Sequence, residues 1–92
     1  SQIDIKLRQQ DLKVTSDSND LVAASNELNV AKRQIDAAKL MLDSGVISLI
    51  DFERRKISFQ NAVAKRVGAE NKFLQSKQEL ISLRIEKNAT VQ

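Results

Sequence analysis

The chain has 92 residues and a formal net charge of +3, with 41% hydrophobic and 29% charged residues. It contains no Cys, which excludes disulfide bonds and thiolate metal sites, and it also lacks His, Trp, Tyr and Pro. A composition rich in Lys, Glu, Gln, Ala and Leu is typical of long helices rather than of a packed globular core. No stretch is long and apolar enough to span a membrane, so we expect no direct membrane insertion by this segment.

An apolar residue recurs at every seventh position through the first half of the chain. The row consists of Leu7, Val14, Leu21, Leu28, Ile35 and Leu42. This spacing predicts a helix over about residues 5–43 with one apolar seam. Ala24, Ala31 and Ala38 lie beside the row, and small residues allow two helix backbones to approach closely.

Two segments of this first helix leave alternatives open. Residues 3–7 alternate between apolar and polar types, which also suits a short strand, and residues 15–20 are poor helix formers. Because Val14 and Leu21 keep the heptad phase on either side of residues 15–20, the pattern favours a continuous helix there.

The end of the first helix is marked by Gly45. It stands where many helices end on a residue with left-handed backbone angles, so we expect a positive φ. Val46 and Met41 would then form the apolar contact of a Schellman ending. The sequence therefore predicts a turn over residues 44–48.

Capping residues also mark the start of a second helix, which we predict over about residues 49–88. Ser48 is a good N-cap, and Asp51 three residues later suits a capping box and the helix dipole. Ile47 before the cap and Phe52 after it are the pair expected of a hydrophobic staple.

The second half repeats the heptad row of the first half. Its members are Phe52, Phe59, Phe73 and Leu80, with Arg66 at the one polar position. Residues paired across an antiparallel hairpin have numbers with a constant sum, and Leu42 with Phe52 gives 94, as does Ile35 with Phe59. We therefore predict an all-α fold, a single long antiparallel coiled-coil hairpin over residues 1–92 with arms of ~60 Å. We also expect it to be a piece of a longer protein.

A second apolar row follows the predicted second helix. Val67, Leu74 and Ile81 are spaced by seven and lie outside the primary seam. They indicate either a wide seam or a lateral contact with neighbouring copies.

The residues of common catalytic sites are missing. There is no His or Cys, no glycine-rich phosphate loop, and no nucleophile with an adjacent base. We predict that the chain is not an enzyme and uses no cofactor or metal. A nucleic-acid partner is disfavoured as well, because the basic residues form no dense stripe and the Phe residues lie on the seam.

Residues 40–48, Leu-Met-Leu-Asp-Ser-Gly-Val-Ile-Ser, lead into Asp51-Phe52-Glu53. This segment resembles the tip of the α-helical hairpin of bacterial membrane fusion proteins, the periplasmic adaptors of the HlyD and AcrA/MacA type. The resemblance implies a parent protein anchored in the inner membrane, which works in the periplasm beside an inner-membrane transporter. It also implies that neighbouring copies line up as a tube whose tips dock on a TolC-like outer-membrane channel.

The resemblance assigns two groups of residues. The docking tip would comprise Met41, Gly45, Val46, Ile47, Ser48 and Asp51, and the lateral contact Val67, Leu74 and Ile81. In the drug-efflux branch the tip carries an Arg, a Leu one turn later and a Ser beyond the turn, of which only Ser48 is present here. Ala37 replaces the Arg and removes its charged donor, so the resemblance favours a type I secretion adaptor over a drug-efflux adaptor.

The alternative is a free-standing coiled-coil scaffold or interaction module with no transport role. Sequence outside residues 1–92 distinguishes the two, because an adaptor has an anchor upstream and lipoyl-like motifs on both flanks of its hairpin.

Overall fold

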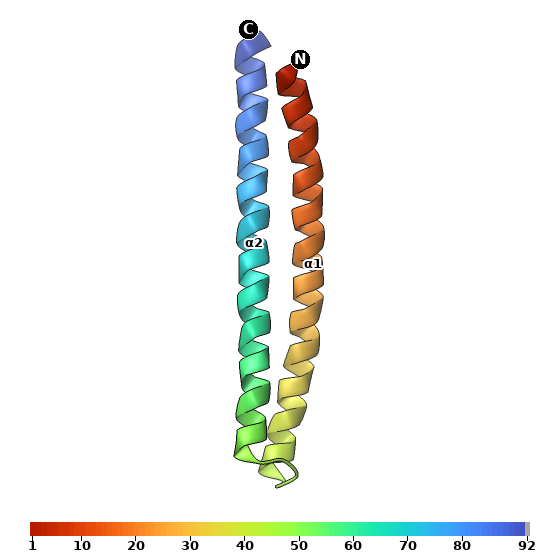
Figure 1. Ribbon diagram of the computed structural model, residues 1–92, viewed down its shortest axis with the longest axis vertical. Helices are drawn as coiled ribbons and strands as arrows, with labels where there is room; N and C mark the ends of the chain where they lie inside the picture. Colours follow the sequence, from red (N-terminus) through yellow and green to blue (C-terminus); the bar gives the residue numbers. More distant parts are fainter. Residues whose placement is uncertain (92) are drawn as a thin grey trace. The chain divides into compact units, whose positions relative to one another are not determined.

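The structure, a computed structural model, describes residues 1–91, with side chains through residue 89. Two helices, α1 (Gln2–Asp43) and α2 (Leu49–Val91), run antiparallel and are joined by the turn at residues 44–48 (Figure 1). The predicted helical hairpin is confirmed. Within the described residues there is no strand, and residues 3–7 belong to the first turns of α1.

The chain divides into two units. The turn half comprises residues 22–67, and the open half comprises residues 1–21 with residues 68–91.

In the turn half, small residues occupy the most buried positions. Ala24 and Ala38 are 2% and 0% exposed, whereas Ile35 and Phe59 of the heptad rows are only half-buried. This is expected if the alanines lie nearest the opposite helix and the larger side chains pack along the edges of the seam. At one such edge, Lys65 Nζ lies 2.9 Å from Glu27 Oε2. Their residue numbers add up to 92, close to the sum of 94 that the sequence predicts for residues paired across the hairpin.

In the open half, the seam contains polar residues. Leu80 and Leu83 are each 8% exposed, but Asp17 and Ser76 are buried even more deeply, at 2% each. Ser76 is bonded on two sides: its hydroxyl donates to the carbonyl oxygen of Phe73, and its own carbonyl oxygen accepts a 2.9 Å bond from the side-chain amide of Gln10.

The polar atoms of Asp17 have fewer hydrogen-bond partners than those of Ser76. Its Oδ1 lies 3.7 Å from Lys72 Nζ, while its Oδ2 is buried without a hydrogen-bond partner among the described residues. A buried carboxylate that is only partly paired weakens a helix seam, because desolvation disfavours the charge.

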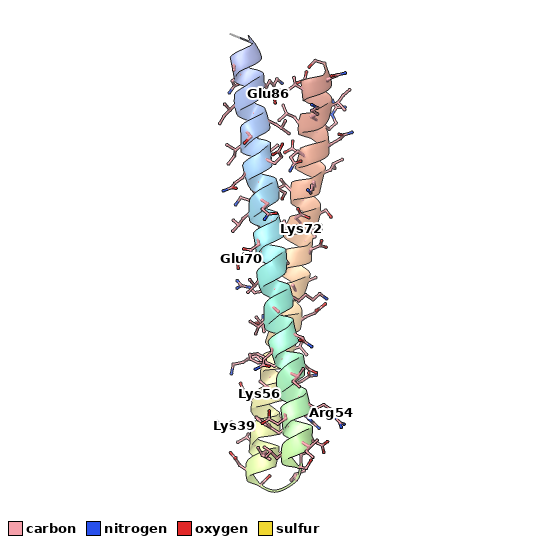
Figure 2. The ribbon with its side chains drawn as sticks, turned by 60° about the vertical axis from the view of Figure 1, so that its left-hand side comes forward. Lys39, Arg54, Lys56, Glu70, Lys72 and Glu86 are labelled. Carbon is pink, nitrogen blue, oxygen red and sulfur yellow. The ribbon has the colours of Figure 1, made fainter. Side chains whose placement is uncertain are left out.

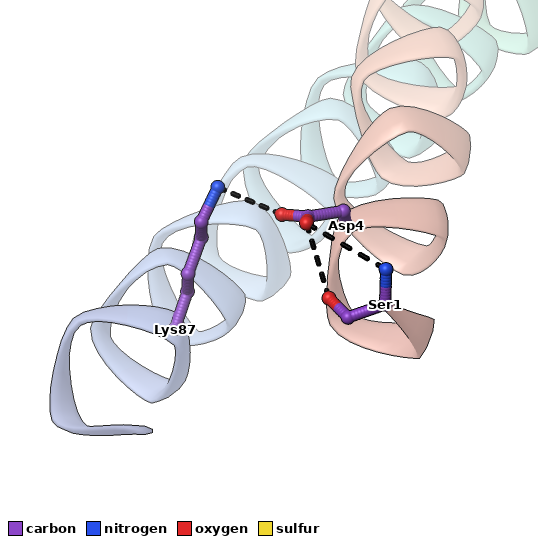
Figure 3. Close-up of polar contacts among 3 residues, drawn as sticks. All are labelled: Ser1, Asp4 and Lys87. Atoms are coloured by element: carbon purple, nitrogen blue, oxygen red, sulfur yellow. Dashed lines mark hydrogen bonds and ion pairs between the residues drawn. The ribbon is translucent and has the colours of Figure 1, made fainter. Parts of the chain in front are cut away.

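Ion pairs follow the edge of the open half. Arg84 Nη2 lies 3.8 Å from Asp11 Oδ1, and Lys87 Nζ lies 2.7 Å from Asp4 Oδ1. Figure 3 shows the Lys87 contact together with the hydroxyl of Ser1, which donates to Asp4 Oδ2 at 3.0 Å. Both hydrogen bonds favour the ionised carboxylate, with the bond from Lys87 the larger cause, and they lower the pKa of Asp4.

The poor helix formers at residues 15–20 do not interrupt α1. Thr15 Oγ1 donates to the carbonyl oxygen of Asp11 at 3.1 Å, so its hydroxyl is satisfied within the helix. Gly68 likewise lies inside α2, and a Cβ added there would meet no atom within 4 Å. It is therefore an open surface position, not a point of close approach.

Candidate docking tip and lateral face

The end of α1 is a Schellman motif. The N–H of Val46 donates to the carbonyl oxygen of Met41 at 2.8 Å, and the N–H of Gly45 donates to that of Leu42 at 3.0 Å. Gly45 has a φ of +78°, which confirms the expectation of a positive φ. The expected apolar contact is weak, however, because Val46 remains 71% exposed and Met41 covers little of it.

The start of α2 is capped by Ser48. Its Oγ accepts a 3.1 Å hydrogen bond from the N–H of Asp51, which confirms the predicted N-cap. Ile47 and Phe52 are both half-buried, as a hydrophobic staple requires. The turn is therefore held at both ends by hydrogen bonds.

The residues predicted to form the docking tip separate into two roles. Gly45, Val46, Ser48 and Asp51 are exposed and available to a partner. Met41 and Ile47 are half-buried, and the carbonyl oxygen of Met41 also accepts a 3.3 Å bond from the N–H of Ile47. Met41 and Ile47 thus support the turn more than they present a surface.

Three exposed apolar residues near the turn were missed by the sequence analysis. Leu40, Leu49 and Ile50 are 71%, 61% and 70% exposed. They belong neither to the heptad rows nor to the motif of the efflux branch. The signal that points to them is that Leu40 and Ile50 occupy heptad positions turned away from the seam, where a solvated coiled coil normally carries polar residues.

The predicted lateral row is open to solvent. Val67, Leu74 and Ile81 are 47%, 46% and 53% exposed. These exposures are those of a separate surface row, not of residues packed into the seam.

In the open half, Leu74 and Ile81 of this row lie on a surface of α2 without charges, which we call the uncharged face. Its exposed residues are Gly68, Asn71, Leu74, Gln75, Gln78, Ile81, Ser82, Ile85, Asn88 and Ala89. The charged residues among residues 68–89 lie instead at heptad positions in or beside the seam. Glu70, Lys72 and Glu86 are three of them and are labelled in Figure 2. A face that remains solvated usually carries charges, so this segregation is unusual for an exposed helix surface.

Within the described residues, no helix is apolar enough over a sufficient length to cross a membrane, and no group of three or more His, Cys, Asp or Glu residues is placed to hold a metal ion. Comparisons with protein-family models, curated proteins and solved structures find no match for the chain.

Proposed function

We propose that this chain is the α-helical hairpin of a periplasmic adaptor in a tripartite export system. It acts there as a spacer and a docking element, not as an enzyme. The observation that carries the proposal is the turn: the segment that resembles the adaptor tip folds into a capped loop that presents Val46 to solvent, and the first residues of α2, Leu49 and Ile50, are exposed beside it.

A capped loop with exposed apolar residues suits docking. Exposed apolar side chains often mark sites of protein–protein contact. Because the Schellman bonds and the Ser48 cap already hold the backbone, binding would order few additional residues and lose little conformational entropy. The proposed partner is a TolC-like outer-membrane channel, and the absence of the efflux-type arginine at Ala37 favours a secretion-type system.

The uncharged face supports lateral contact between neighbouring copies. Two identical faces repel each other if both carry the same net charge, and a face without charges avoids this cost. Leu74, Ile81 and Ile85 supply apolar area on this face, and Asn and Gln side chains supply hydrogen-bonding groups. In the proposed function, the parent protein is anchored in the inner membrane and places these contacts in the periplasm, beside an inner-membrane transporter.

The test of docking uses apolar residues at the turn whose side chains have no part in its hydrogen bonds. Ile50→Asp in the full protein should abolish export by living cells while the helicity of the purified 92-residue chain stays unchanged. The matched control is Leu12→Asp, since Leu12 is 69% exposed and lies in the open half, far along the sequence from the turn.

Normal export by cells carrying Ile50→Asp and Val46→Asp together would contradict the docking role. That result would favour the free-standing scaffold, in which no export system depends on the tip.

A further inference from the structure

A hollow beside the seam of the turn half has a lining suited to binding a small anion. It is lined by Ala31, Gln34, Arg55, Ser58 and Phe59 and has a volume of about 280 Å³. Ala31 and Phe59 are half-buried, whereas Gln34, Arg55 and Ser58 are exposed. The hollow thus combines apolar walls with three polar side chains.

The hollow lies where an arginine replaces a seam residue. Arg55 precedes Ala62 by seven residues and so continues the row of small residues on α2, yet its side chain is exposed. A guanidinium is too strongly hydrated to be buried against apolar neighbours without a partner. The position that an alanine would fill in this layer therefore stays open to solvent.

Arg55 has no ion-pair partner among the described residues. In the same half, Lys32 pairs with Asp36 at 2.8 Å and Lys65 pairs with Glu27 at 2.9 Å. No carboxylate lines the hollow; Asp51 lines an adjoining depression, which Arg55 and Ser58 line as well. Arg54 lines that depression too, so its guanidinium offsets the negative charge of Asp51 there.

The polar side chains of the hollow are mainly hydrogen-bond donors. Arg55 offers a planar fork of N–H groups and Gln34 an amide NH₂ group. The hydroxyl of Ser58 donates a long 3.4 Å bond to the carbonyl oxygen of Arg54, and it would turn to donate to a bound anion. A guanidinium fork matches the two oxygens of a carboxylate, and such charge-assisted bonds are about twice as strong as neutral ones.

We propose that this hollow receives a carboxylate from an Asp or Glu side chain of the protein on which the tip docks. The identity of that partner rests on the proposed function, whereas carboxylate binding by the hollow does not. The site therefore adds a charged contact on α2 to the apolar contacts of the turn.

The first experiment measures carboxylate binding by the 92-residue chain alone. Sodium acetate is titrated against sodium chloride at constant ionic strength, and the side-chain N–H signals of arginine and glutamine are followed by NMR. Saturable shifts are expected at Arg55 and Gln34, lost in Arg55→Gln and retained in the control Arg33→Gln, an exposed arginine that does not line the hollow. Non-saturating shifts of equal size at Arg33 and Arg55 would overturn the proposal.

The second experiment asks whether the carboxylate comes from a partner protein. Arg55→Glu in the full protein should reduce export at least tenfold, and Arg33→Glu should not. Mutations that restore export to Arg55→Glu should replace an acidic residue of a partner by Lys or Arg. Normal export by Arg55→Glu would overturn the partner's role even if acetate binds. Saturable acetate binding together with normal export by the tip variants would instead refute the proposed function and leave the site standing.

Discussion

The N–H of Val46 donates a 2.8 Å hydrogen bond to the carbonyl oxygen of Met41, and this bond closes the last turn of α1. The bond requires left-handed backbone angles at the intervening Gly45, whose φ of +78° is readily adopted only by glycine. The shape of the exposed tip therefore depends on one residue without a side chain.

Replacing Gly45 by Val should destabilise the hairpin by ~1–2 kcal/mol, because a β-branched residue resists left-handed backbone angles. Urea unfolding followed by circular dichroism measures the change. Gly68→Ala is the matched control, since a Cβ at this helical position meets no atom within 4 Å and should stabilise α2 by ~0.5–1 kcal/mol. Equal midpoints for the wild type and Gly45→Val would remove the Schellman motif as a source of stability.

Cysteines placed at Ala31 and Ala62 should form a disulfide within one chain. Both residues are half-buried in the seam of the turn half, and the wild-type chain has no Cys to compete. Non-reducing electrophoresis distinguishes a cross-linked monomer from a dimer. The control pair is Ala37 with Ala64, two exposed positions on the same two helices, which should not cross-link within one chain. If Ala31 and Ala62 cross-link only between chains, the protein in solution is an open, paired form of the hairpin.

Asp17→Ala should raise stability by about 1 kcal/mol, because it removes a buried carboxylate whose Oδ2 is unsatisfied. Alanine already occupies the equivalent seam positions at Ala24 and Ala38, so it suits the space. Lys72→Gln should have the opposite effect, since it removes the cation nearest the buried charge. Thermal unfolding measures the change in stability of both variants, and Asp20→Ala at an exposed position is the control. A loss of more than 1 kcal/mol in Asp17→Ala would show that the pair with Lys72 contributes net stability.

The contact between Asp4 and Lys87 should make the open half less stable in acid. The pKa of Asp4 is lowered in the folded chain from its ordinary value of 3.8, chiefly by the hydrogen bond from Lys87. The unfolded state therefore binds the proton more readily, so the contribution is fully present above pH 3.8 and is lost as pH falls through the lower folded value. The effect is small because the pair is exposed to solvent.

Melting temperatures of the wild type and Asp4→Asn, compared across pH 2–7, measure this contribution. The two curves should differ near neutral pH and converge in acid, and Lys87→Gln should reproduce the behaviour of Asp4→Asn. A constant difference at all pH values would assign the stabilisation to something other than the Asp4 carboxylate.

The sequence alone was sufficient to predict the two helices, their antiparallel arrangement and the turn. Local chemistry decides these features: heptad spacing aligns one face of each helix, Gly45 supplies the left-handed residue, and Ser48 supplies the cap. The signals for the turn lie within a few residues of it, whereas the heptad rows extend along both halves of the chain and predict the antiparallel pairing. The alternating pattern at residues 3–7 was ambiguous because a few residues fit both a strand and a helix end, and the structure places them in α1.

The tertiary structure decided which side chains are buried and which remain available. Asp17 is deeply buried, Leu49 near the turn is exposed, and Arg55 lines a hollow although it occupies a seam position. These outcomes depend on how near the opposite helix comes and how it faces each residue, which the spacing along one helix does not contain. Burial is a property of two helices together, whereas capping and periodicity belong to each helix by itself.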